Sequence, residues 1–471
     1  MFSDHGSCQR GTTRVLFWII DLPISEFRQM QQSGFQQMMR LWEQVHPVNA
    51  VQCVELSASF EFGRLQAAVQ RSLQKLETTF SGGDWRLHFG GSDLTGADIV
   101  ETSVPCLCNG HAVEEFITRL MNHRFLDTQL PVRVGYFLRA KIHVIWICYR
   151  HVIADARSIA RLLQHIIEEL SAPAGIDLPI GLSRIEAGSP LRPIGHCQSK
   201  VLTRIRLRLA TLLKLQRCTR PSSPGKTLRQ MQFRFHARDL PLESLKQQAR
   251  TYGCSVGELF SAAVLEWAGQ QRDSALKWPW ASSVCVSILA DLTSRGTTGS
   301  ESLFGQFICP FTIYNKKNAP FQSLVRSAGT QLRGERNLQI ALQNLEGLKH
   351  NSLCLRMIPR RIGKFLQDML FPISAAVSNV NLNSMLPSSR CHELVAGYWR
   401  STCATPFSPI IVCLTTHGSR CTLTSTHFSD VYDEGSVQYL GQHLQKRLFN
   451  IDFDQPSLLH EMEVQDRLLP K

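Results

Sequence analysis

The chain has 471 residues, 43% of them hydrophobic and 19% charged, which is typical of a globular protein with a large core and excludes a mainly disordered chain. The length exceeds what one hydrophobic core usually supports, so we expect two domains. The formal net charge of +13 favours an anionic partner but does not identify it; nucleic acid, a phosphorylated cofactor, an acidic protein and a membrane surface all fit.

The first half of the chain alternates strand and helix patterns. The predicted elements, in order, are a strand at residues 50–60 (AVQCVELSASF), a helix at 61–76, a helix at 111–123, strands at 132–140 and 141–150, and a helix at 157–170. The two strands at 132–150 are expected to pair through a tight turn. The last strand leads directly into the segment YRHVIADA, residues 149–156.

A proline-rich stretch separates the two halves. From about Ser171 to Pro224 the periodic pattern stops, and prolines stand at positions 173, 179, 190, 193, 221 and 224. We therefore place an N-terminal domain at residues 1–185, a basic linker at 186–228 and a C-terminal domain at 229–471.

The second half repeats this arrangement. Its predicted elements are strands at 229–237, 282–292, 375–382, 408–417 and 420–428, and helices at 241–253, 255–271 and 434–449. Two mixed halves, each with helices packed on one side of its strands, predict an α/β (α+β) fold.

The cysteines and the N-terminus bear on the cellular compartment. The 15 cysteines are scattered and no C-x-x-C pair has zinc-site spacing, so we expect reduced, mostly buried thiols, no bound metal and a cytoplasmic location. The apolar VLFWII near the N-terminus is short and is followed by Asp21, unlike a secretory signal. No apolar run approaches the roughly 20 residues of a membrane span.

Two short segments imitate catalytic motifs. GCSVG, from Gly253 to Gly257, matches the G-x-S-x-G pattern of a hydrolase nucleophile, but a helix pattern rather than a strand precedes it. We interpret Ser255 and Glu258 as a capping box at the start of a helix. PGKT, which begins at Pro224, lacks the earlier glycine and the strand of a phosphate-binding loop, and we discard it.

The segment 200–217 (KVLTRIRLRLATLLKLQR) mixes basic residues with leucines. It fits a surface helix with some leucines docked on the protein, and it also fits a basic amphipathic helix in peripheral contact with an anionic membrane. No nucleic-acid recognition motif accompanies the basic charge, so we expect no nucleic-acid partner.

His151 and Asp155 occupy the junction between a buried strand and a helix. Imidazole has an unperturbed pKa of about 6.5 and can accept a proton near neutral pH. A carboxylate nearby can hold a loop through an arginine or backbone N–H groups. The spacing equally fits a structural role, in which Asp155 caps the helix and His151 is an ordinary loop histidine.

Four further segments accompany this junction in a fixed order: 57–75 and 129–138 upstream, and 288–311 (with ILADLTSR and FGQFICPF) and 377–381 (VSNVN) downstream. Together they resemble the condensation-domain superfamily, which is related to chloramphenicol acetyltransferase and has the signature H-H-x-x-x-D-G. The resemblance covers about residues 45 to 450, with His151 as the second signature histidine and Asp155 as the signature aspartate.

The chain departs from the family pattern at three positions. Arg150 replaces the first signature histidine, which mainly packs in the family, and Ala156 replaces the glycine, which places a methyl group where the tunnel would pass. Thr293 stands where the family often has an arginine. An ion pair of Asp155 would therefore use Arg295 or another partner.

The resemblance implies two chloramphenicol acetyltransferase-like subdomains in a V shape around a central tunnel. It implies a stand-alone acyltransferase that moves an acyl group from a coenzyme A or carrier-protein thioester to an alcohol or amine of a secondary metabolite or lipid. His151 would be the general base and Asp155 would orient the loop. Arg150, Ala156, Ser378 and Asn379 would lie along the tunnel.

The implied co-substrate is an acyl-CoA or acyl-carrier thioester, with no bound cofactor. The implied partners are a small-molecule acceptor and, in one version, an acyl carrier protein, and we expect a monomer. An alternative is a binding module. In this alternative, Arg150 and Ala156 reflect a loss of catalytic activity, and the protein recruits a carrier protein or another partner.

Overall fold

The computed structural model describes residues 33–58, 60–80, 100–101, 110–125, 132–139, 142–172, 213–219, 230–271, 280–292, 304–335, 344–345, 347–352, 358, 372–385 and 393–451. The predicted linker boundaries, at 185/186 and 228/229, lie outside these residues, and so does most of the basic segment 200–217. Its described end contains the exposed Leu213 and the buried Leu215.

The first sheet has five strands in the order β10-β1-β4-β3-β2. Its members are β1 (Asn49–Leu56), β2 (Val100–Glu101), β3 (Val132–Arg139), β4 (Ile142–Arg150) and β10 (Val395–Thr402). Strand β1 is antiparallel to both β4 and β10, and all its residues are buried, the polar Gln52 and Glu55 included. Strands β3 and β4 form the antiparallel pair predicted from the sequence.

The second sheet has seven strands, in the order β5-β7-β9-β11-β12-β6, with β8 paired to β7. Its members are β5 (Cys218–Thr219), β6 (Met231–Pro241), β7 (Ser283–Asp291), β8 (Ile308–Lys316), β9 (Ala375–Asn381), β11 (Ile410–His417) and β12 (Arg420–Phe428). Strand β9 runs parallel to β7 and β11, whereas the remaining long pairs are antiparallel. The sheet is therefore mixed.

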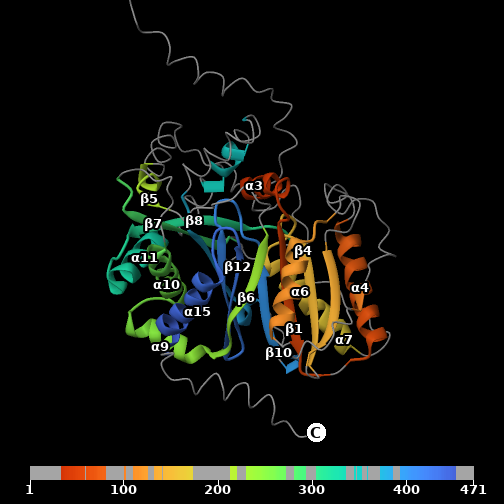
Figure 1. The fold of residues 1–471 in the computed structure, drawn as a ribbon. Coiled ribbons are helices and arrows are strands. Elements are labelled where there is room, and N and C mark those ends of the chain that lie inside the picture. Colours follow the sequence, from red (N-terminus) through yellow and green to blue (C-terminus); the bar gives the residue numbers. More distant parts are fainter. Residues whose placement is uncertain are drawn as a thin grey trace, which may run out of the picture.

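The helices cover the two sheets (Figure 1). The first half carries α3 (Gly34–Glu43), α4 (Phe62–Phe80), α6 (Gly110–Asn122) and α7 (Ala156–Ser171); the second half carries α9 (Leu242–Thr251), α10 (Val256–Gln270), α11 (Phe321–Glu335), the short η5 (Leu382–Ser384) and α15 (Glu434–Phe449). Apolar side chains of α9, α10, α11 and α15 form one buried cluster with β7, β9, β11 and β12. A second cluster joins the first sheet to residues of the second half, such as Trp399 and Phe428.

Strand β10 connects the two halves, because it comes from the second half of the chain but completes the first sheet. It pairs with β1 from Ala50↔Thr402 to Leu56↔Val395. It also packs against β11 and β12 of the second sheet. Residues of β10 can therefore contact both sheets.

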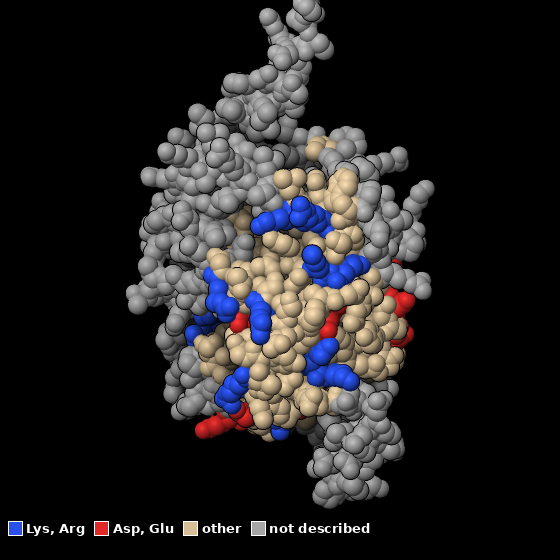
Figure 2. All heavy atoms as spheres, turned by 90° about the vertical axis from the view of Figure 1, so that its left-hand side faces the viewer, with Lys and Arg blue, Asp and Glu red and all other residues tan. Residues whose placement is uncertain are grey.

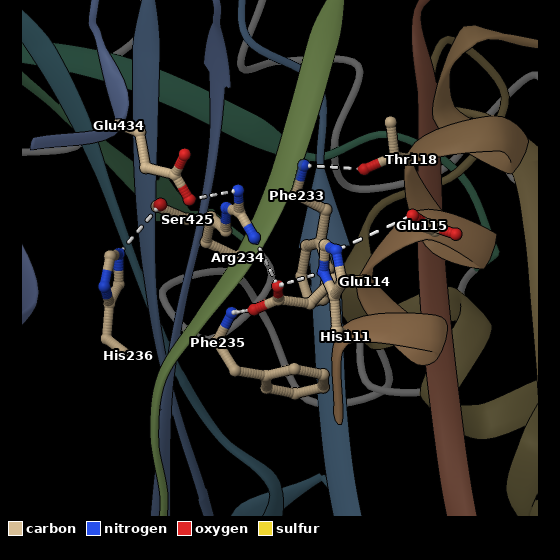
Figure 3. Close-up of polar contacts among 10 residues, drawn as sticks. All are labelled: His111, Glu114, Glu115, Thr118, Phe233, Arg234, Phe235, His236, Ser425 and Glu434. Carbon is tan, nitrogen blue, oxygen red and sulfur yellow. Dashed lines mark hydrogen bonds and ion pairs between the residues drawn. The ribbon is translucent and has the colours of Figure 1, made fainter. Parts of the chain in front are cut away.

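Helix α6 of the first half closes the open edge of β6 in the second sheet (Figure 3). Glu114, Thr118 and Asn122 accept hydrogen bonds from the backbone N–H groups of Phe235, Phe233 and Met231, at 2.8, 3.0 and 3.0 Å. Four residues of a helix rise about 6.0 Å, and two residues of a strand rise about 6.6 Å. Side chains four apart on α6 therefore match alternate N–H groups of β6. We call this contact the α6–β6 seam.

An arginine adds charge pairing to the α6–β6 seam. Arg234 of β6 contacts Glu114 through Nη1 and Glu434 of α15 through Nη2, both at 2.7 Å (Figure 3). Asn122 also donates to the carbonyl of Met231 at 2.7 Å. An exposed strand edge is a template for unwanted pairing, and the helix removes that template.

The capping box predicted at Ser255 is confirmed. Its hydroxyl accepts from the N–H of Glu258, whose carboxylate accepts from the N–H of Ser255, and α10 begins at Val256. The GCSVG segment is therefore the start of a helix. Seven of the observed elements, α3, β2, β5, β8, α11, η5 and β10, had no prediction.

The expectation of buried thiols holds for the described cysteines. Of the nine, all but Cys254 are buried, and no disulfide joins them. Burial raises the pKa of Cys403 to about 12 and that of Cys254 to about 11, so both remain protonated thiols at neutral pH.

Candidate active site

The segment between β4 and α7 is held by both halves of the chain. The backbone N–H of His151 donates to Val48 O at 2.7 Å, and that of Asp155 donates to Gly305 O at 2.9 Å. The side chain of Gln36 donates to Val152 O at 3.0 Å. These bonds fix the backbone from which the His151 and Asp155 side chains extend.

His151 is 5% exposed and is oriented by a hydrogen bond. Its Nδ1 lies 3.0 Å from the carbonyl of Ala154, which can only accept, so Nδ1 carries the proton and Nε2 keeps its lone pair. Gln306 holds the backbone beside it, because its Nε2 donates to His151 O at 2.8 Å. Nε2 of His151 has no hydrogen-bond partner in the described part of the chain.

Burial keeps this imidazole neutral. Loss of water around the ring lowers the pKa of His151 to about 4, the hydrogen bond to Ala154 opposes that shift, and the positive charge of Arg400 adds to it. At neutral pH the ring is therefore an unprotonated base that faces a positive charge.

Asp155 is the N-cap of α7. Its Oδ1 accepts from the N–H of Ser158 at 2.9 Å, and its Oδ2 accepts from the N–H of Phe307 at 3.1 Å. The carboxylate thus ties the start of α7 to the loop before β8. Burial and the charge of Asp291 raise the pKa of Asp155 to about 6, despite these donors. The capping role considered from the sequence is confirmed.

An ion pair crosses the same junction. Arg157 Nε lies 2.8 Å from Asp291 Oδ2, joining the first turn of α7 to the end of β7. The candidate partner Arg295 lies outside the described residues, so its pairing with Asp155 stays a prediction. The described donors to Asp155 are backbone N–H groups, and the arginine of this junction pairs with Asp291 instead.

A pocket of about 50 Å³ opens where the two sheets meet. Its lining residues are Gln52, Tyr149, His151, Asp155, Ala156, Arg157, Leu289, Asp291, Ile308, Ser378, Asn379, Val380, Met385, Arg400, Ser401 and Thr402. The structure therefore brings together five of the residues chosen from the sequence, namely His151, Asp155, Ala156, Ser378 and Asn379.

Arg150 lies apart from this group. Its Nε and Nη2 contact the two carboxylate oxygens of Glu43 at 3.0 and 2.8 Å, so it fastens the end of β4 to α3. This bidentate pair gives the side chain a structural role at the position of the first signature histidine. Arg150 does not line the pocket.

Sequence reasoning missed other polar residues that the sheets contribute to the pocket, among them Gln52 and Arg400. Gln52 donates from Nε2 to the hydroxyl of Tyr149 at 3.1 Å and to the carbonyl of Ala156 at 3.2 Å, and Tyr398 donates to its Oε1. A glutamine on the otherwise apolar face of a strand was an available signal. Arg400 offered none, because its partners are distant in the sequence.

Among the described residues, no cluster of His, Cys, Asp and Glu could hold a metal ion, and no helix is long and apolar enough to cross a bilayer. Figure 2 shows Lys and Arg side chains spread over the described surface on the α11 side of the molecule, with fewer Asp and Glu. This surface would attract an anionic partner.

Comparison with solved structures identifies the fold. The trichothecene 15-O-acetyltransferase of Fusarium sporotrichioides superposes with a TM-score of 0.58 at 10% identity, over 89% of this chain and 94% of that one. The starter condensation domain of rhizomide synthetase, solved with C8-CoA and Leu-SNAC, gives 0.56 at 13% identity over 91% and 95%. The first condensation domain of the calcium-dependent antibiotic synthetase, solved with a substrate analogue, gives 0.56 at 13% identity over 88% and 95%.

No family model matches the chain, and no curated protein matches it by sequence. At such low identity, the structural likeness shows the fold alone. The chain has the fold of condensation domains, with two chloramphenicol acetyltransferase-like subdomains, and the fold class expected from the sequence is confirmed.

Proposed function

We propose that this protein is an acyltransferase that uses His151 as general base to move an acyl group from a thioester to an alcohol or amine. One observation carries the proposal: the Ala154 carbonyl fixes the tautomer of a neutral, pocket-lining imidazole and leaves its Nε2 available. The hydroxyl or amine proton would pass to Nε2 as the nucleophile attacks the thioester carbonyl, and then to the departing thiolate. The fold shared with an acetyltransferase supports this chemistry.

The start of α7 supplies donors for the negative charge that develops on the carbonyl oxygen. The N–H groups of Ala156 and Arg157 lie at its first two positions, where a helix offers no acceptor of its own. Neither has a partner among the described residues. Donors directed at the developing oxyanion are a large source of rate enhancement in acyl transfer, and Asp155 places them by capping the helix.

The thioester donor is acyl-CoA or an acyl carrier protein. Both are anionic, which fits the net charge of +13 and the basic surface in Figure 2. The related fold that was solved with C8-CoA shows that a coenzyme A thioester can bind such a scaffold. We also propose that the protein is a cytoplasmic monomer, as expected from its sequence.

The test offers the purified protein acetyl-CoA and octanoyl-CoA together with a pool of alcohols and amines. Release of free thiol is followed over time, and products are identified by mass spectrometry. We expect thiol release that requires both protein and acceptor. Thiol release at the background rate with both donors, and with acyl carrier thioesters in a second series, would reject the acyltransferase assignment.

A further inference from the structure

Arg400 brings a positive charge into the pocket without an acidic partner. The residue is 3% exposed and lies on β10. Its Nε donates to Thr415 Oγ1 at 3.1 Å, and its Nη2 donates to Ser378 O and Oγ at 2.8 and 2.9 Å. All three acceptors are neutral. Nη1 has no acceptor among the described residues, so its two N–H groups are available to a ligand.

One other charge that lines the pocket, that of Asp155, also lacks an ion-pair partner among the described residues. Arg157 pairs with Asp291 at 2.8 Å, and Asp155 accepts two backbone hydrogen bonds. No carboxylate of the described chain lies within ion-pair distance of Arg400. A buried guanidinium without a counter-charge is unfavourable. Around Arg400, the pocket is therefore complementary to a ligand that brings a negative charge.

A second polar group beside Arg400 is unsatisfied. Thr402 follows two residues later on β10, so the two side chains extend from the same face of the strand. Thr402 is 4% exposed and lines the pocket, and its Oγ1 is buried with no hydrogen-bond partner among the described residues. A hydroxyl and a guanidinium on one face together suit the two oxygens of a carboxylate.

We propose that Arg400 and Thr402 bind a carboxylate on the acyl acceptor, so that the acceptors are hydroxy acids or amino acids rather than neutral alcohols or amines. This inference rests on the proposed function, since it names the class of acceptor. A thioester donor is a poorer match, because the pantetheine arm next to its carbonyl is uncharged and the phosphates of coenzyme A lie at the far end of that arm.

Arg400 and His151 line the same pocket, which gives the bound carboxylate a second effect. The arginine charge disfavours protonation of the imidazole. A carboxylate on Arg400 offsets that charge, so the ring becomes a stronger base when the acceptor is bound. The acid limb of the kcat profile should therefore lie at higher pH for a carboxylate acceptor than for its neutral analogue.

Binding without turnover gives the first test. Titration calorimetry compares butyrate with its neutral isostere butyramide, on the wild type and on Arg400→Gln. We expect the wild type to bind butyrate at least about tenfold more tightly, and Arg400→Gln to lose that preference. Arg447→Gln is the matched control, because it removes an arginine paired with Glu266 away from the pocket, and it should keep the preference. Equal binding of both probes by the wild type would refute the proposal.

Turnover gives the second test, with acetyl-CoA as donor and the acceptor pairs valine and valinamide, and lactate and methyl lactate. Arg400→Gln should raise KM for valine and lactate about tenfold or more. The KM values for the neutral acceptors, valinamide and methyl lactate, should not change. A kcat loss of equal size for charged and neutral acceptors would instead assign Arg400 to the oxyanion and overturn the proposal. Absence of turnover with all acceptors would count against the acyltransferase function, while the butyrate titration would still decide the carboxylate site.

Thr402→Val supplies a milder variant in case Arg400→Gln does not fold. It removes one hydroxyl and keeps the shape of the side chain. We expect it to weaken the preference for butyrate over butyramide several-fold, and Thr402→Ser to restore it. An unchanged preference in Thr402→Val would remove Thr402 from the site.

Discussion

Two of the polar regions at which the halves of the chain meet, the α6–β6 seam and the pocket, differ in how well their polar groups are paired. At the seam, the side chains of Glu114, Thr118 and Asn122 each accept a backbone N–H of β6, and Arg234 contacts two carboxylates. At the pocket, Thr402 Oγ1 and Arg400 Nη1 have no described partners.

The difference separates stability from function. A buried polar group without a partner costs roughly 1–3 kcal/mol, and a ligand that supplies the missing partner offsets that cost. At the seam, each of the three backbone N–H donors of β6 has a side-chain acceptor on α6. Substitutions at the seam should therefore change stability, and substitutions at the pocket should change turnover.

The largest expected effect is at His151. His151→Ala should lower kcat by about 10²–10⁴-fold, because proton transfer to Nε2 is lost. Loss of the bond to Ala154 should cost only about 1 kcal/mol of stability. Steady-state kinetics and calorimetric melting on the same preparation measure both effects. Wild-type turnover in the variant would end the general-base assignment.

The pH–rate profile tests the same residue without a substitution. Because the pKa of His151 lies at about 4, Nε2 is unprotonated from about pH 5 upward. We expect His151 to add no inflection to kcat/KM between about pH 6 and 8, and kcat/KM to fall about tenfold per pH unit well below pH 4. Initial rates at low temperature, with circular dichroism to confirm folding, give the profile. A midpoint near 6.5 that persists in Asp155→Asn would mean that water reaches the His151 ring freely.

Acid should weaken the second sheet beside the seam. Burial is the main cause that lowers the pKa of His236 to about 3 and that of His427 to about 4, so both are neutral when folded but protonate on unfolding near pH 6.5. Stability is therefore lost as pH falls below 6.5, by up to about 1.4 kcal/mol per pH unit for each group.

Denaturant melts at pH 7.5, 5.5 and 4.5 measure this dependence. His236→Gln cannot titrate, so its stability should fall less steeply on acidification than that of the wild type. Asp155 acts in the opposite direction, because its raised pKa stabilises the fold as pH falls from about 6 toward 3.8. Parallel pH curves for wild type and His236→Gln would show that His236 does not contribute.

A single hydroxyl tests the pairing at the seam. Thr118→Val keeps the shape of the side chain but leaves the N–H of Phe233 without an acceptor, at a cost of about 1–3 kcal/mol. Thr118→Ser should recover most of the loss. The kcat of Thr118→Val, measured well below its melting temperature, should equal that of the wild type. A kcat that falls together with stability would contradict the proposed difference between the seam and the pocket.

The smallest effect on stability is expected at Asp155, whose side chain contributes both to stability, as a helix cap, and to turnover, as a residue of the pocket. Asp155→Ala should cost about 0.5–2 kcal/mol as a lost helix cap and also lower kcat, because the start of α7 shifts. Asp155→Asn keeps an oxygen for the N–H of Ser158 and should retain most of the stability. If Asp155→Ala proves inactive yet fully stable, the capping bond of Asp155 would contribute nothing to the free energy of unfolding.

The sequence predicted the parts of this protein that depend on neighbouring residues. The β3–β4 pair, the His151 junction and the Ser255 capping box each follow from a local pattern. The pocket depends on contacts that no local pattern contains. Arg400 bonds to two other strands, and the loop before β8 supplies the donor from Phe307 to Asp155.

The role of β10 was also beyond the sequence. Its pattern indicates an extended segment at most, and nothing in it indicates that it would leave the second sheet to pair with β1. The family resemblance was enough to predict that Ser378 and Asn379 line the pocket. Arg400 and Thr402 could be placed there only once the structure showed that β10 pairs with β1, with Gln52 opposite Arg400 and Ala50 opposite Thr402.

That pairing has a consequence for biosynthesis. Strand β1 is translated early, but the strand that covers its free edge ends at Thr402. At a synthesis rate of about 5–20 residues per second, the ribosome needs roughly 20–70 s to reach that strand after finishing β1. During this interval the first sheet has an open apolar edge, which is the kind of template on which nascent chains aggregate. We therefore expect the nascent chain to be at risk of aggregation until β10 has left the ribosome.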